Sequence, residues 1–169
     1  MKGKNYRSIK GQAYTRKEYI HGSPLSRLSK YTMGDTKARF EQRAALISLK
    51  DVQIRHNALE AARVAANKVL FDKLGEKGYC LRIQVYPHQV LRENKMMAFA
   101  GADRLQEGMR KSFGTPTGTA ARVRTNQVIM VADVNANGTE AAKYALLQGS
   151  KKLPTLCRVE VKKRDAPAA

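Results

Sequence analysis

The sequence predicts an α+β fold, a two-layer α/β sandwich in which two main helices cover one face of a mixed, mostly antiparallel sheet. Apolar and polar residues alternate at 79–85 and 157–162, as they do in half-buried strands. Apolar residues recur at helical spacing over 59–74 and again over 139–149. The patterns follow one another as strand–helix–strand, a long connection and strand–helix–strand. This arrangement leaves the other face or an edge of the sheet for a partner.

The first strand–helix–strand unit occupies residues 44–86. Residues 44–50 are expected to form a strand. Asn57 and Glu60 have the spacing of a capping box, which predicts that the first helix begins at Asn57. Gly75 is well placed to end this helix. The apolar stripe of the helix consists of Leu59, Ala62, Ala66, Val69, Leu70 and Leu74.

The second unit begins with a short strand at 120–124 and a buried strand within 127–134. A turn is expected at 135–138, and Thr139 is expected to cap the second helix, which should end near Gly149. The inward-facing residues of that helix are predicted to be Ala141, Ala142, Ala145 and Leu146. The last strand contains Cys157, Val159 and Val161.

The segment 88–122 connects two strand-like segments, 79–86 and 127–134. Connections of this length are uncommon in compact domains, and most of them are functional or disordered. The segment is rich in glycine and in basic residues and has only scattered apolar positions. We therefore predict a long internal functional loop that does not build a core of its own.

The chain is strongly basic, with a net charge of +18 over 169 residues and a pI of about 10.2. Such a charge is typical of a nucleic-acid-binding protein. Residues 1–43 hold eleven Lys or Arg and three Asp or Glu, a net charge of +8, with tyrosines interleaved. They are predicted to form a basic RNA-binding arm that orders on its partner, the alternative being a disordered basic tail. Residues 44–169 would form a single domain that remains intact without the arm.

Catalytic and metal-binding patterns are not recognisable in the sequence. His21, His56 and His88 are isolated, which favours polar surface or RNA-contact roles, and Cys80 and Cys157 are expected to be buried, reduced thiols. We predict a protein that is not an enzyme and needs no metal, cofactor or small-molecule substrate. The longest apolar run is far shorter than a membrane span, and no signal-peptide pattern follows the basic N-terminus. A membrane partner is therefore not expected.

Several long motifs resemble one family. The stretch VLRENKM at 90–96 is followed by AGADRLQEGMRKSFGTPTGTAARV at 100–123 and by QVIM at 127–130. Together with the residues at 15–24 and 59–68, these motifs resemble the large-subunit ribosomal protein family L-ten-e of archaea and eukaryotes, the counterpart of bacterial L-sixteen. The resemblance covers nearly the whole chain.

The resemblance implies a hammerhead-like α/β sandwich located in the large ribosomal subunit, and hence a cytoplasmic location on the ribosome. A protein of this family would be a structural constituent that binds large-subunit ribosomal RNA and helps to position A-site tRNA near the peptidyl-transferase centre. Its partners would be that RNA, the A-site tRNA and neighbouring ribosomal proteins, and RNA would perform the chemistry. The alternative is a general RNA-binding architectural or chaperone protein that acts outside the ribosome.

Two groups of residues are expected to form the binding site. The predicted RNA-binding residues are Lys2, Lys4, Arg7, Lys10, Tyr14, Arg16, Lys17, Arg27, Lys30, Lys37, Arg39, Arg92, Lys95, Arg122 and Arg124. The resemblance places Arg104, Arg110 and Lys111 near the tip of the internal loop, close to tRNA and the peptidyl-transferase centre.

Overall fold

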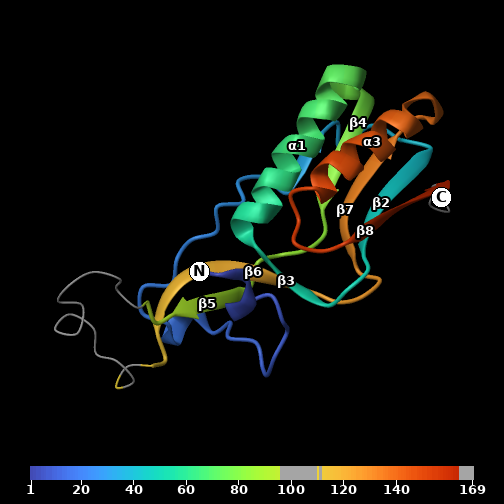
Figure 1. The fold of residues 1–169 in the computed structure, drawn as a ribbon. Coiled ribbons are helices and arrows are strands. Elements are labelled where there is room, and N and C mark those ends of the chain that lie inside the picture. Colours follow the sequence, from blue (N-terminus) through green and yellow to red (C-terminus); the bar gives the residue numbers. More distant parts are fainter. Residues whose placement is uncertain (96–109, 111, 164–169) are drawn as a thin grey trace, which may run out of the picture.

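The computed structural model describes residues 1–95, 110 and 112–163. Two helices lie side by side on one face of a five-stranded sheet, and a smaller three-stranded sheet lies at one end of this body (Figure 1). The predicted α+β class is confirmed. The second sheet was not predicted.

The five-stranded sheet forms the main body. Its strands are β1 (Thr32–Gly34), β2 (Gln42–Ser48), β4 (Tyr79–Ile83), β7 (Val128–Val134) and β8 (Cys157–Lys163), in the order β1-β4-β7-β2-β8. Each neighbouring pair is antiparallel. In β2, Ala44 and Leu46 are fully buried in the core under the helices, whereas Ala45 points to the opposite face and is half-buried. The helices thus cover only one face of the sheet.

Helix α1 (His56–Leu74) buries the predicted apolar stripe. Leu59, Ala62, Ala66 and Leu70 are buried, and Val69 and Leu74 pack against them. The predicted capping box is wrong, because the preceding strand runs directly into the helix and Arg55 occupies the N-cap position. Glu60 instead accepts hydrogen bonds from Arg63 Nε at 2.9 Å and from Ser29. Gly75 ends the helix as predicted, with a φ of 69° and its N–H bonded to the carbonyl of Phe71.

Helix α3 (Thr139–Ser150) buries Ala142, Ala145 and Leu146, while Ala141 is only half-buried. The prediction that Thr139 caps this helix is wrong. The N-cap is Gly138, which ends a short 3-10 turn, η5 (Ala136–Gly138), and the Thr139 hydroxyl donates to the carbonyl of Ala136 at 2.8 Å. The backbone hydrogen bonds of this turn satisfy N–H groups at the start of the helix, which a capping side chain would otherwise bind.

The smaller sheet corrects the prediction of a loop over 88–122. Its strands are β3 (Val52–Arg55), β5 (Gln89–Glu93) and β6 (Thr115–Val123), in the antiparallel order β3-β6-β5. Both ends of the predicted loop therefore belong to a β-hairpin, and the part of the prediction that falls on 96–109 and 111 lies outside the described residues. Ile54, Val90, Ala121 and Val123 are at most 1% exposed. This small sheet therefore has a buried apolar side, contrary to the expectation.

Gly114 closes the hairpin at the end next to the connection. Its φ is +77°, and a Cβ atom there would lie 2.7 Å from the carbonyl carbon of Glu93. A side chain at this position would be strained and would separate β5 from β6.

The amino-terminal 43 residues are joined to the body. They contain two short 3-10 turns, η1 (Gly3–Asn5) and η2 (Lys17–Tyr19), and the edge strand β1, which pairs with β4. Leu28 and Met33 belong to the main core cluster, and Ile20 and Phe40 are also buried. Residues 1–43 thus supply part of the core and an edge strand, which counts against the prediction that residues 44–169 stay folded without them.

The two cysteines do not form a disulfide, in agreement with the prediction. Cys80 is buried, but Cys157 lies at the start of β8 and is only half-buried, which corrects the prediction for that residue. Partial burial raises the pKa of the Cys157 thiol to about 11. It is therefore protonated and unreactive near neutral pH.

A buried carboxylate links three strands of the large sheet. Asp133 on β7 is fully buried and accepts hydrogen bonds from Arg43 Nε on β2 at 2.7 Å and from an Arg82 guanidinium nitrogen on β4 at 2.6 Å. Burial alone would raise the pKa of Asp133, but the two arginines outweigh burial and hold the pKa below its ordinary value. The carboxylate is therefore ionised in the folded protein at neutral pH.

Replacement of Asp133 by Asn should lower the free energy of unfolding by about 2 kcal/mol at pH 7, because the charge-assisted bonds are lost and two arginines remain unpaired. A depressed folded-state pKa stabilises the fold above the unfolded-state pKa near ~3.9, and this stabilisation is lost as the pH falls through the folded-state pKa. The difference between wild type and variant should thus shrink in acid. Urea unfolding followed by circular dichroism measures it. Glu160→Gln, which breaks the partly exposed pair with Arg158, should change stability by no more than about 0.5 kcal/mol.

Deletion of residues 1–43 should abolish cooperative unfolding, because it removes β1 and core side chains of the large sheet. In the full-length chain, Leu28→Ala and Met33→Ala should each cost about 2–3 kcal/mol by leaving a cavity in the core. Denaturant melts test both statements. A truncated protein that unfolds cooperatively at the wild-type midpoint would restore the prediction of an independent arm.

Candidate nucleic-acid interface

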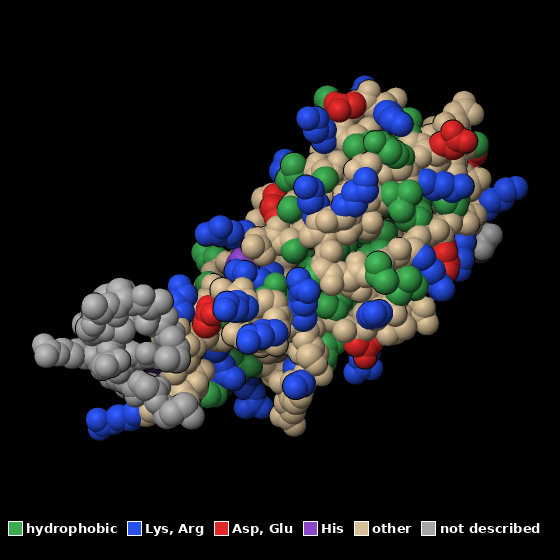
Figure 2. All heavy atoms as spheres, in the orientation of Figure 1, with side chains coloured by type: hydrophobic (Ala, Val, Ile, Leu, Met, Phe, Trp, Pro, Cys, Tyr) green, Lys and Arg blue, Asp and Glu red, His purple; other side chains and the backbone are tan. Residues whose placement is uncertain are grey.

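Most of the cations expected to bind RNA are exposed. The exposed members are Lys2, Lys4, Arg7, Lys10, Arg16, Lys17, Arg27, Lys30, Lys37, Arg39, Lys95, Arg110 and Arg124, whereas Tyr14, Arg92 and Arg122 are half-buried. Figure 2 shows Lys and Arg side chains spread over one face of the molecule, with few Asp and Glu among them. Arg104 and Lys111 lie outside the described residues.

A glutamine on β3 holds the start of the arm. The Gln53 side chain donates to the carbonyls of Tyr6 and Ser8, both at 2.9 Å, and its backbone N–H donates to the carbonyl of Arg7 at 2.8 Å. Gln53 is 5% exposed, so these bonds are largely shielded from water. Residues 6–8 therefore follow β3 with their backbone fixed, while the Arg7 side chain is exposed.

The next part of the arm is held by β6 and β5. The Arg122 guanidinium donates to the carbonyls of three consecutive residues, Lys10, Gly11 and Gln12, at 3.1–3.2 Å. The Tyr14 N–H donates to Gln89 Oε1 at 2.7 Å, and the carbonyl of Tyr14 accepts from the N–H of Val90 at 2.9 Å. Arg122 thus has a structural role that the sequence did not indicate.

The guanidinium of Arg92, on β5, lies against two aromatic rings where the hairpin meets the connecting segment. Its central carbon is 4.3 Å from the Tyr14 ring centroid and 3.4 Å from that of Phe113. The two rings meet edge to face, with centroids 5.8 Å apart. Cation–π contacts hold an arginine in a defined direction while leaving its hydrogen-bond donors available. The ring of Tyr14 therefore already has an internal partner.

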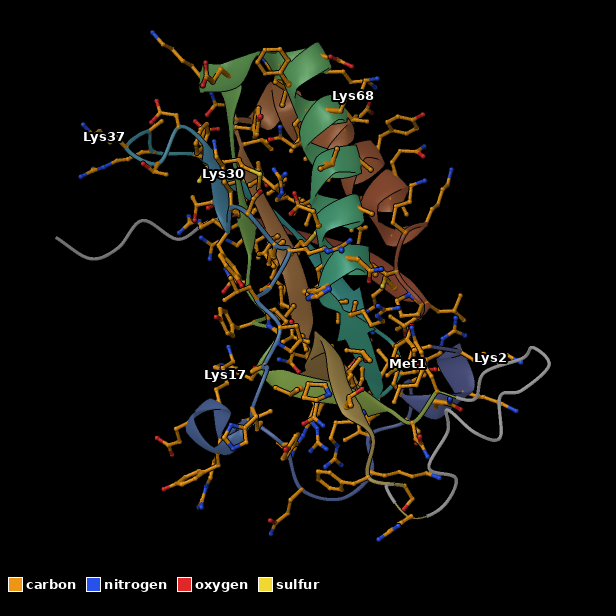
Figure 3. The ribbon with its side chains drawn as sticks, turned by 90° about the vertical axis from the view of Figure 1, so that its left-hand side faces the viewer. Met1, Lys2, Lys17, Lys30, Lys37 and Lys68 are labelled. Carbon is orange, nitrogen blue, oxygen red and sulfur yellow. The ribbon has the colours of Figure 1, made fainter. Side chains whose placement is uncertain are left out.

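The tyrosines expected to offer stacking faces differ in their surroundings. The Tyr6 ring lies 5.8 Å from the guanidinium carbon of Arg55, and Tyr31 stacks on Tyr86. Tyr19 is 73% exposed. Figure 3 shows three lysines, Lys17, Lys30 and Lys37 (the edge lysines), along one side of the molecule.

The three histidines have different environments. His21 and His88 are exposed. His56 is 5% exposed, and its Nδ1 lies 2.8 Å from Thr119 Oγ1. Burial, followed by the nearby charges of Arg55 and Arg27, lowers the pKa of His56 and keeps its ring neutral. The expected surface or RNA-contact role is therefore wrong for His56, which connects α1 to β6.

The described residues contain no group of three or more His, Cys, Asp and Glu that could hold a metal ion. None of the helices among them is both long and apolar enough to span a membrane. On the sheet face opposite the helices lies a shallow hollow of about 470 Å³, lined in part by Arg43, Glu160 and Lys162. Its position on an open face and its charged lining do not resemble an enclosed substrate site.

Comparison with known proteins assigns the chain to a family. Residues 9–160 match the family described as Ribosomal protein L16p/L10e. A Staphylothermus marinus protein named large ribosomal subunit protein uL16 is 52% identical over 157 residues, or 93% of this chain and 90% of the relative. Proteins with the same name from Hyperthermus butylicus and Sulfolobus acidocaldarius are 50% and 49% identical over 96% and 99% of this chain, and over 92% and 96% of their own lengths. The chain therefore belongs to the ribosomal protein L16p/L10e family.

Proposed function

We propose that this protein is a non-catalytic structural component of the large ribosomal subunit in the cytoplasm. It binds large-subunit ribosomal RNA through the basic surface formed by residues 1–39 and the small sheet, and it contacts neighbouring ribosomal proteins. The segment between β5 and β6, with Arg104, Arg110 and Lys111, helps to position A-site tRNA near the peptidyl-transferase centre. Family membership supports the location, and the internal contacts of the arm support the manner of binding.

The observation that carries the proposal is the way in which the arm is attached. Gln53, Gln89 and Arg122 bind the arm through its backbone amides and carbonyls. The lysine and arginine side chains of the arm are thus left exposed, in positions set by a folded sheet. Phosphate contacts from such fixed cations position a protein on RNA without reading its sequence. Recognition would then depend on the shape of the folded RNA.

The hairpin of β5 and β6 provides a fixed base for the tRNA-facing segment. Both strands are paired up to Glu93 and Thr115, and Arg92, Tyr14 and Phe113 pack together at the same end. Because this base is part of the folded body, the segment would leave it in a defined direction.

Co-sedimentation separates a ribosomal component from a general RNA-binding protein. The tagged full-length chain should remain with large subunits after a high-salt wash, because contacts with folded RNA and protein resist the loss of phosphate attraction. If the wash released the chain while it still bound bulk RNA at low salt, the proposal of a subunit component would be wrong.

The edge lysines should contribute directly to RNA affinity. Replacing Lys17, Lys30 and Lys37 together by Gln should lower the slope of log affinity against log salt by about 2, since each phosphate contact adds about 0.7–0.9. The measurement is filter binding of large-subunit ribosomal RNA over a range of salt concentrations. The charge-matched control is Lys68→Gln with Lys143→Gln and Lys151→Gln, three exposed positions on α1, on α3 and just after α3. Equal slopes for the two variants would show that the edge lysines do not form the RNA-binding surface.

Replacement of residues 96–111 by a short Gly/Ser linker should impair A-site tRNA binding in assembled subunits. This exchange keeps Phe113, Gly114 and Thr115, which belong to the base of the hairpin. Core stability should change little, because the free energy of loop closure varies slowly with loop length. Arg104→Ala with Arg110→Ala should have a weaker effect in the same direction. Subunits that carry the linker and bind A-site tRNA with wild-type affinity would assign this segment to another role.

A further inference from the structure

A cluster of aromatic rings lies at the surface next to Lys17, one of the edge lysines. The Tyr31 and Tyr86 rings stack nearly parallel, with an interplanar angle of 18° and centroids 5.5 Å apart. The His88 ring lies 4.4 Å from that of Tyr86, and the Lys17 ammonium lies 5.9 Å from the same ring. Tyr86 is nevertheless 45% exposed. Large rings held together at a surface without full burial are typical of binding sites.

The backbone fixes this cluster in place. Along residues 84–88, Gln84, Tyr86 and His88 are exposed, whereas Val85 and Pro87 are buried. The alternation turns both rings of the segment outward from a buried support. The carbonyl of Tyr31 accepts a hydrogen bond from the N–H of Ile83 at 2.8 Å, which attaches Tyr31 to the end of β4.

We propose that Tyr31, Tyr86 and His88 form a stacking platform for one unpaired base of ribosomal RNA, with Lys17 bound to a phosphate of the same strand. This inference rests on the proposed RNA-binding function and adds a base contact to its phosphate contacts. The surroundings favour RNA over a protein partner, because the Tyr86 ring lies next to Lys17, and Figure 3 shows Lys17 together with Lys30 and Lys37 along one side of the molecule. Aromatic rings combined with backbone-tracking cations are how proteins bind single-stranded nucleic acid. Because the rings are already held, stacking would cost little conformational entropy.

The chain offers a matched control for this platform. Tyr144 on α3 is 47% exposed, and the Lys73 ammonium lies 4.6 Å from its ring. Its exposure is therefore close to that of Tyr86, it also has a lysine over its ring, and it belongs to the helical layer. Effects that are due only to an exposed tyrosine near a lysine should appear at both positions.

The chain has no tryptophan, so Tyr86→Trp and Tyr144→Trp each introduce a single indole fluorophore. Titration of the full chain with single-stranded oligoadenylate should quench Trp fluorescence in the Tyr86 variant and leave it unchanged in the Tyr144 variant. Inorganic polyphosphate, which carries charge but no base, should quench neither. Tyr86→Ala should weaken oligoadenylate binding roughly tenfold, whereas Tyr86→Phe and Tyr144→Ala should bind like wild type. Circular dichroism verifies that each variant is folded.

Two outcomes would overturn the inference. If Tyr86→Ala binds oligoadenylate like wild type and the indole at position 86 is not quenched, the platform does not bind bases, while the proposed function stands as long as the chain binds ribosomal RNA. If the wild-type chain binds neither oligoadenylate nor ribosomal RNA, both the platform and the proposed function fail.

Discussion

Three polar side chains of the small sheet, Gln53, Gln89 and Arg122, hold the amino-terminal segment by its backbone. Peptide groups that are shielded from water need hydrogen-bond partners, and outside its short 3-10 turns the arm takes them from the body. Here the partners come from strands that lie far away in the sequence. The backbone positions of Arg7 and Lys10 depend on these bonds. This part of the basic surface is therefore a consequence of the pairing of β3, β6 and β5.

The few acidic residues are used mainly inside the main body. Asp133 lies between Arg43 and Arg82, Glu60 pairs with Arg63 on α1, and Glu160 pairs with Arg158 on β8. These pairs reduce repulsion where arginines are close together on the sheet and helix. Among the described residues, the edge lysines form no salt bridge, and the Lys17 ammonium lies over the face of the Tyr86 ring. Their charges are thus available to an external polyanion, and self-repulsion should fall when RNA binds.

The sequence predicted the elements whose patterns are local and missed those that depend on distant partners. The stripe from Leu59 to Leu74 and the alternation from Tyr79 to Val85 each contain enough periods to identify a helix and a strand. By contrast, Val90 and Leu91 lie among polar residues, and β6 contains two glycine- or proline-bearing positions, Pro116 and Gly118. Their pairing arises only when β5 and β6 meet. Register between distant strands has no signal in either segment alone.

The same reasoning explains which site residues were predictable. Exposed cations such as Lys30 and Lys37 were predicted from charge alone, since a basic chain places most of its charges on the surface. The role of Gln53 could not be predicted from the sequence, because its neutral amide binds carbonyls that lie 45 and 47 residues away. Arg122 was predicted to bind RNA because of its charge, but its guanidinium donates hydrogen bonds to the protein's own backbone. In this fold, a basic residue such as Arg122 therefore holds the backbone of the arm, and other lysines and arginines of the arm are exposed on the resulting surface.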